Sequence, residues 1–326
     1  MHQQQRTSFS VASSSVVATD AAAPLPPGSA GAGAGTAFAA VVVANVALAF
    51  GPWFVRLADT GPVASAFWRI AIAIPFLVAL AIAGGARRTR PTPLLWTILI
   101  GAGIAFAADL GTWHLGIMRT TLANATLFGN TATLIFPIYG FLIARAWPTR
   151  LQAVALALAA LGGALLLGQS YQLDPRHLAG DLLCLFAGLL YTTYFIAMTR
   201  ARIVMAPLPA LALSTIASAL PLLGFAWLLG ERIVPGGWWP LVGLAIVSQV
   251  IGQGLMIYAL GRLPPLVIGI ALLVQPIVAG AIGWIVYDER LGAPDLVGVA
   301  LVAAALVLVR RGQVAPRVAT AQEDGR

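Results

Sequence analysis

Ten long apolar stretches follow one another through this chain of 326 residues, and they constrain its fold more than any motif does. Each is close to the length of about 20 residues that a helix needs to cross a bilayer. Only helices and closed barrels cross lipid with their backbone hydrogen bonds satisfied. The sequence therefore predicts an all-α integral membrane protein with ten transmembrane helices. The expected spans are residues 36–58, 63–83, 93–117, 121–144, 149–168, 178–199, 207–230, 238–260, 264–287 and 292–310.

The composition fits a membrane protein and excludes several kinds of chemistry. Hydrophobic residues make up 60% of the chain and charged residues 9%, against about 25% charged residues in soluble domains. The net charge of +8 comes from arginine alone, because the chain contains no lysine. This excludes mechanisms that need a lysine, such as Schiff-base chemistry. The single cysteine, Cys184, excludes an intrachain disulfide and a cysteine-based metal cluster.

Arginine is distributed unevenly between the two ends of the expected spans. With the N-terminus in the cytoplasm, the cytoplasmic segments hold 13 arginines and the outer loops hold 5, while Arg69 lies inside a span. Positive charge concentrates on the cytoplasmic side of membrane proteins. We therefore expect both termini in the cytoplasm and no nucleic-acid partner. Residues 1–35 and 311–326 are expected to form disordered tails.

A weak internal repeat recurs at an offset of 143 residues. It aligns Gly111 with Gly254, Arg119 with Arg262 and Gly140 with Gly283. The two expected repeats are residues 36–168 and 178–310, with five spans each. An odd number of spans gives the repeats opposite orientations, which is typical of alternating-access transporters. Chance overlap of apolar sequence is the alternative interpretation.

Four stretches together resemble the EamA-like branch of the drug/metabolite transporter superfamily. The likeness covers residues 40–310 and implies ten helices in two inverted repeats that export or exchange small metabolites. It does not name the substrate. The stretches are 45-NVALAFGPWFVRLA-58 with 66-AFWRIAIAIPFLVAL-80, 108-ADLGTWHLGIMRTTLANATLFGN-130, 180-GDLLCLFAGLLYTTYFIAMTRAR-202 and 273-LVQPIVAGAIGWIVYDERLGAPDLVG-298.

The first repeat departs from the pattern of the second. Pro276 precedes Glu289 by 13 residues, but the equivalent positions of the first repeat hold Thr133 and Ala146. The nearest proline in the first repeat is Pro137, one turn further along. A symmetric role for this proline and acid therefore does not carry over.

Three ionisable residues lie inside the expected spans and away from their ends, where charge is costly and marks functional sites. Arg69 and Asp109 fall at similar depths, about 9–10 Å and about 12 Å below the outer edge at 1.5 Å per residue. We therefore expect them to form an ion pair, either structural or involved in substrate or proton binding. His114 is expected near the outer interface, where its imidazole either relays protons or forms a local hydrogen bond.

Amides and aromatics supply the remaining site candidates. Amides at mid-membrane depth either join helices or line a polar cavity. Two tyrosines three residues apart share one helix face and are positioned to stack on an organic substrate or to pack in the core. The candidates are Asn130, Gln249, Gln253, Gln275, Tyr191 and Tyr194.

These features favour a secondary transporter in a bacterial inner membrane that exports small organic metabolites, such as amino acids or amphipathic compounds. Its expected partners are the substrate, the lipid bilayer and protons, with no cofactor and no metal. The sequence leaves its oligomeric state open. A facilitated-diffusion carrier and a non-transporting scaffold or sensor remain alternatives. An enzyme is disfavoured, because neither an HExxH nor a GxSxG motif is present.

Overall fold

The computed structural model describes residues 30–84, 91–120, 125, 128–168, 177–287 and 292–314, and every regular element in these ranges is a helix. Most of the predicted N-terminal tail lies outside these residues, and Glu289 lies wholly outside them. At least three expected boundaries are wrong by several residues, because the first helix already begins at Ala30, the helix that begins at Leu178 continues to Val204, and the last helix continues to Val314.

The first half of the chain contains six described helices. Two of them, α3 and α4, begin with a proline, which fits the first turn because its missing N–H has no partner there. The helices are α1 (Ala30–Ala49), α2 (Gly51–Leu57), α3 (Pro62–Ala83), α4 (Pro93–Ile117), α6 (Ala132–Ala144) and α7 (Arg150–Gly168).

The second half contains eight helical segments, because two of its five expected spans are not continuous α-helices. The expected span 238–260 consists of two α-helical ends around a π-helix, and the expected span 264–287 is broken at Leu273. The segments are α8 (Leu178–Val204), α9 (Pro207–Leu228), α10 (Trp239–Gly243), η1 (Leu244–Gln253), α11 (Gly254–Leu260), α12 (Pro265–Leu272), α13 (Val274–Tyr287) and α14 (Ala293–Val314).

Seven helical stretches in the described residues are long and apolar enough to cross a membrane. Three further apolar helices, within α6, α7 and α14, are shorter. The chain is thus a multi-pass membrane protein, and the full number of ten spans remains a prediction.

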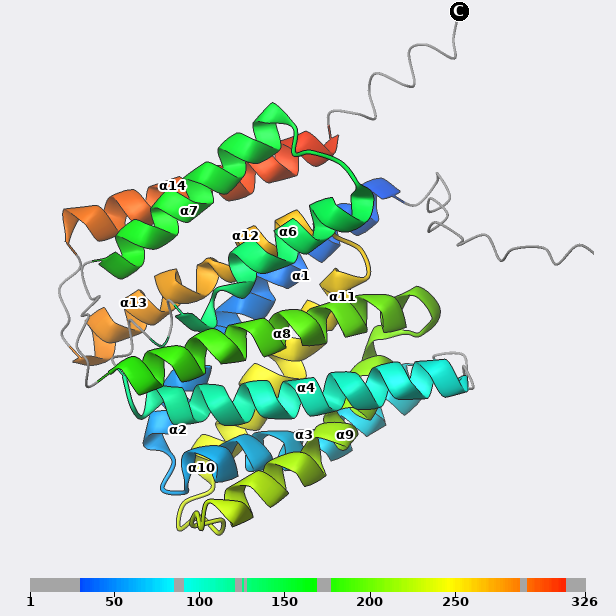
Figure 1. The fold of residues 1–326 in the computed structure, drawn as a ribbon, viewed down its shortest axis with the longest axis vertical. Coiled ribbons are helices and arrows are strands. Elements are labelled where there is room, and N and C mark those ends of the chain that lie inside the picture. The colour runs from blue at the N-terminus through cyan, green and yellow to red at the C-terminus, as the bar shows by residue number, and fades with distance from the viewer. Residues whose placement is uncertain are drawn as a thin grey trace, which may run out of the picture.

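The helices pair between the two halves of the chain in a repeated pattern. Helix α3 packs against α9, α6 against α12, and α7 against α14. Between these pairs α4 packs against α8, and α1 packs against η1 and α11. Figure 1 shows the pairs stacked in layers, from α7 and α14 at the top to α3 and α9 at the bottom, all running between the same two edges.

The two halves begin at opposite edges of the molecule. In Figure 1, α1 runs from the right-hand edge to the left and α8 runs from the left-hand edge to the right. Helices α7 and α14 also run in opposite directions, although they pack side by side.

Candidate functional site

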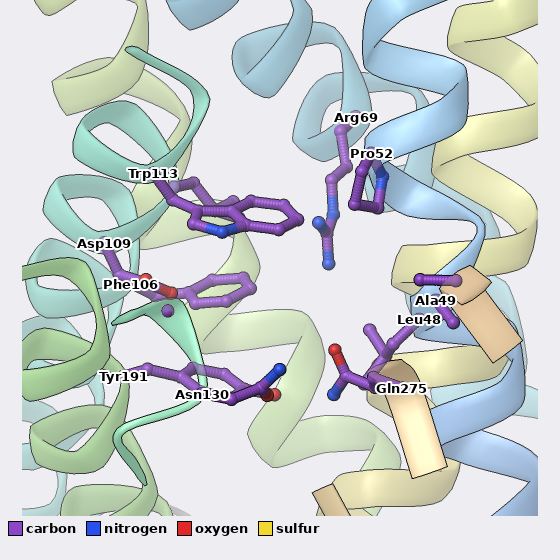
Figure 2. A pocket seen from close by; sticks show the side chains of 13 residues that line it. Leu48, Ala49, Pro52, Arg69, Phe106, Asp109, Trp113, Asn130, Tyr191 and Gln275 are labelled. Carbon is purple, nitrogen blue, oxygen red and sulfur yellow. The ribbon is translucent and has the colours of Figure 1, made fainter. Parts of the chain in front are cut away.

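A pocket between the two halves is the strongest candidate site. It holds about 670 Å³ of empty space, including its open mouth. Figure 2 shows Arg69 reaching into it, with Asp109, Phe106 and Trp113 on one side and Gln275 on another. The lining residues are Leu48, Ala49, Pro52, Arg69, Phe106, Asp109, Leu110, Trp113, Gly129, Asn130, Tyr191, Gln275 and Ala279.

Breaks in two spans occur where those spans line the pocket. Helix α12 ends at Leu272, four residues before Pro276. A proline cannot donate a backbone hydrogen bond, and its ring clashes with the carbonyl four residues earlier, so the helix breaks there. Gln275 lines the pocket just beyond this break. Helices α1 and α2 are likewise separated at Phe50, beside Pro52.

Arg69 brings a buried positive charge from α3 to the pocket. Its side chain is only 3% exposed, and its Nε donates a hydrogen bond of 3.1 Å to Oε1 of Gln249. The guanidinium carbon lies 5.9 Å from the centre of the Phe106 ring. An arginine has five N–H donors, and within the described part of the chain no hydrogen bond is made by its two terminal nitrogens.

Asp109 supplies the opposite charge from α4, and the predicted ion pair with Arg69 is wrong. No ion pair joins the two among the residues that the structure describes, and the Asp109 carboxylate forms no hydrogen bond with them although the residue is 7% exposed. Both side chains line the same pocket, but similar depths on two helices do not fix how far apart the charged groups lie. The Arg69 guanidinium lies against the Phe106 ring and bonds Gln249 instead.

Two of the four predicted amides line the pocket directly. They are Asn130 and Gln275. The Gln275 Nε2 donates to Oδ1 of Asn45 at 2.8 Å, and the Asn45 amide donates to the carbonyl of Val41 at 2.7 Å. Gln275 is thus held by a buried asparagine that the sequence reasoning missed.

Gln249 and Gln253, which were also predicted as site candidates, do not line the pocket. Both are fully buried on η1, and each forms a hydrogen bond with a residue that lines the pocket. Gln249 accepts from Arg69 and donates to Thr215 at 3.3 Å. Gln253 accepts from the hydroxyl of Tyr191 at 3.0 Å. The π-helix, which a sequence pattern does not reveal, presents this face to α1 and α3.

Aromatic rings form one wall of the pocket. Tyr191 lines it, as predicted for a stacking residue, and packs 4.2 Å from Phe195. Tyr194 lies behind this wall, completely buried and stacked on Phe106 at 4.5 Å. Tyr194 therefore supports the wall and does not face the cavity.

His114 lies in the last turn of α4 and outside the pocket lining, and it forms local hydrogen bonds. The start of α3 covers it completely, and its Nδ1 lies 2.9 Å from the carbonyl oxygen of Pro62 and 3.1 Å from Oγ of Ser65. Because a carbonyl only accepts, the contact with Pro62 places a proton on Nδ1. The described residues offer its Nε2 no partner, so no proton path through His114 is visible.

The arrangement suits reversible binding of a polar organic molecule. It offers one cation, one anion, two amides and an aromatic wall within one small space. The described residues contain no group of three histidine, cysteine or acidic side chains that could hold a metal ion. Converging polar groups in a partly apolar pocket are typical of small-molecule sites.

Fold and pocket together define a multi-pass membrane protein with a pocket that residues of both halves line. Residues 33–168 and 178–311 each match the EamA-like transporter family. The chain therefore belongs to this family, within the drug/metabolite transporter superfamily, and the resemblance inferred from its motifs is confirmed.

Solved structures support the same fold. Matches are found to 29 chains. One crystal structure aligns with a TM-score of 0.69 and 17% identity, covering 86% of this chain and 98% of its own. At this identity the likeness shows the fold alone. No curated protein matches the chain.

Proposed function

We propose that the protein is a secondary transporter that carries small organic metabolites by alternating access. The observation that carries this proposal is the pocket at the junction of the two repeats, with opposite charges that do not pair with each other. Substrate sites of inverted-repeat transporters lie at such a junction, often beside broken helices. A molecule with one carboxylate and one amine, such as an amino acid, or a neutral amphipathic compound, matches this lining.

The proposed architecture is ten spans in two inverted five-helix repeats. The repeated pairing of helices and their opposite directions support it. We place both termini in the cytoplasm of a bacterium, with the protein in the inner membrane. The edge where α6, α8 and α11 end is the richer in arginine, as the positive-inside rule requires. The described arginines there are Arg145, Arg150, Arg200, Arg202, Arg262, Arg310 and Arg311.

Proton coupling is proposed to occur at Asp109. Its carboxylate faces the pocket without a protein partner in the described residues. It can therefore exchange a proton whenever the pocket opens to water, and a bound amine can replace that proton. A carrier without such exchange would be a facilitator, whose flux ignores a pH gradient.

Blocking the pocket tests whether it is the path of transport. The purified protein in liposomes is screened with amino acids, nucleosides and amphipathic amines to find a transported compound. We expect Ala279→Phe to abolish its flux, because Ala279 lines the pocket and the added ring fills it. Val286→Phe, two turns along α13 and 48% exposed, is the matched control and should transport normally. Undiminished flux in Ala279→Phe would contradict the proposal.

A further inference from the structure

We propose that Arg69 binds a carboxylate of the transported molecule through its two terminal nitrogens, and that Gln249 positions the guanidinium to do so. This inference rests on the proposed function, because it assigns one part of the same pocket. It adds the chemical class of the ligand group and a positioning residue that does not itself touch the pocket.

The first step is the incomplete pairing of a buried cation. Arg69 is 3% exposed, and only its Nε is hydrogen-bonded within the described chain. Buried charges are normally paired and fully hydrogen-bonded, because leaving water is otherwise strongly unfavourable. Figure 2 shows the guanidinium directed into the pocket. The free donors therefore face the space that a ligand would fill.

The second step is the choice of ligand group. The planar guanidinium matches both carboxylate and phosphate oxygens with two parallel hydrogen bonds. Among the described residues, Arg69 is the only cationic side chain that lines this pocket, and Asp109 lines it too. A doubly charged phosphate would leave one negative charge unmatched and would be repelled by Asp109. A singly charged carboxylate balances Arg69 alone.

The third step is the fixed direction of the guanidinium. Gln249 is completely buried, and its Nε2 donates to Thr215, which turns its Oε1 toward Arg69. With Nε held in this way, the two terminal nitrogens point away from Gln249 and into the pocket. The Phe106 ring lies against the guanidinium and continues into the aromatic wall, which suits the apolar part of an organic acid.

Matched probes that differ in one charge test this assignment. Binding of 3-phenylpropionate and of its amide, 3-phenylpropionamide, is measured by calorimetry on the purified full-length protein. We expect the carboxylate to bind about tenfold more tightly or better, because hydrogen bonds to charged groups are the stronger ones. Arg69→Gln should abolish this preference. Arg69→Lys should reduce it, because an ammonium lacks the fork.

The role of Gln249 has its own readout. Gln249→Met should lower the preference for the carboxylate while leaving amide binding nearly unchanged, which a general loss of structure would not do. Arg262→Lys, at an exposed site on the Tyr258 ring, and Gln152→Met, on α7, are the controls and should keep the preference. Each variant is first checked for a normal melting temperature.

The outcomes separate this inference from the proposed function. If the wild type shows no preference, whether both probes bind equally or neither binds, the carboxylate assignment is overturned. Flux that Ala279→Phe abolishes would leave the transport function standing in that case. If Arg69→Gln removes the preference but Gln249→Met does not, the positioning role of Gln249 is overturned. Loss of preference in both variants, with both controls normal, supports the proposal.

Discussion

At the scale of single residues, two side chains of opposite charge line the pocket without forming an ion pair with each other. Arg69 and Asp109 are 3% and 7% exposed, yet neither is the other's ion-pair partner. Burial of an unpaired ion is unfavourable by several kcal/mol even after relaxation. A ligand carboxylate at Arg69 or a proton on Asp109 would each reduce this cost. This property distinguishes a binding site from a structural salt bridge.

Replacing the buried arginine and its glutamine by apolar residues tests that cost. In the double variant Arg69→Met with Gln249→Met, we expect the free energy of unfolding of the ligand-free protein to stay unchanged or to rise by about 1–2 kcal/mol. The buried Arg69 charge and the Gln249 amide are both removed there, so neither is left without a partner, while Asp109 is unchanged. Unfolding in detergent by a denaturant series measures it, with Arg262→Met as the control. A fall of about 3–5 kcal/mol would instead indicate a broken structural ion pair.

At the scale of elements, the broken spans decide where the site forms. The lengths of the apolar stretches predict where helices lie, because hydrophobicity is a local property of the sequence. They do not predict that η1 is a π-helix or that Leu273 interrupts a span, because these features depend on neighbouring helices. In the sequence, only Pro276 indicates the interruption at Leu273. The predicted Arg69–Asp109 pair failed for the same reason, since depth along two helices says nothing about their lateral spacing.

A loop carboxylate stabilises the first turn of α3. Glu231 follows α9, and its two oxygens accept from the backbone N–H groups of Val63 at 3.2 Å and Ala64 at 2.7 Å. These donors have no partner within the helix, and a negative charge is favourable at a helix N-terminus. Gly61 allows this approach, since a Cβ there would lie 2.3 Å from Glu231 Oε2.

Removing this cap should weaken α3 where it carries Arg69. We expect Glu231→Ala to lower the free energy of unfolding by about 1–2 kcal/mol. Glu231→Gln should lower it less, because one acceptor oxygen remains while the charge is lost. Unfolding in detergent measures the total, and hydrogen exchange at residues 63–65 locates the effect. Equal stability of all three proteins would show that the contact contributes nothing.

A second contact joins the same two loops at the edge of the molecule. The backbone N–H of Gly236 donates to Asp59 at 2.7 Å, and this hydrogen bond lowers the pKa of the exposed Asp59 carboxyl. Because folding lowers this pKa, the stabilisation by the contact is fully present above the usual pKa of an aspartate and is lost as the pH falls through the lowered pKa of the folded protein. Two carboxylates therefore join the loop before α3 to the loop after α9. Glu231 reaches from the second loop to the start of α3, and Asp59 reaches from the first loop to Gly236.

At the scale of the whole molecule, the two repeats share one pocket and differ in how they build it. The first repeat supplies both charges, from α3 and α4, while the second supplies Tyr191 and Gln275 and the buried glutamines behind them. Movement of one repeat against the other would therefore separate Arg69 from Gln249 and Tyr191 from the lining of α4. Such coupling between helix movement and site geometry is what alternating access requires.

The most direct test of this account is flux driven by an imposed pH gradient in liposomes, with the wild type and Asp109→Asn compared on the compound found in the screen. The account predicts that the gradient drives accumulation by the wild type. It also predicts that Asp109→Asn, inserted and folded normally, loses this acceleration while it still exchanges substrate between the two sides. Gradient-driven accumulation that persists in Asp109→Asn would contradict the assignment of Asp109 as the proton site. Wild-type flux that is indifferent to the gradient would contradict proton coupling itself.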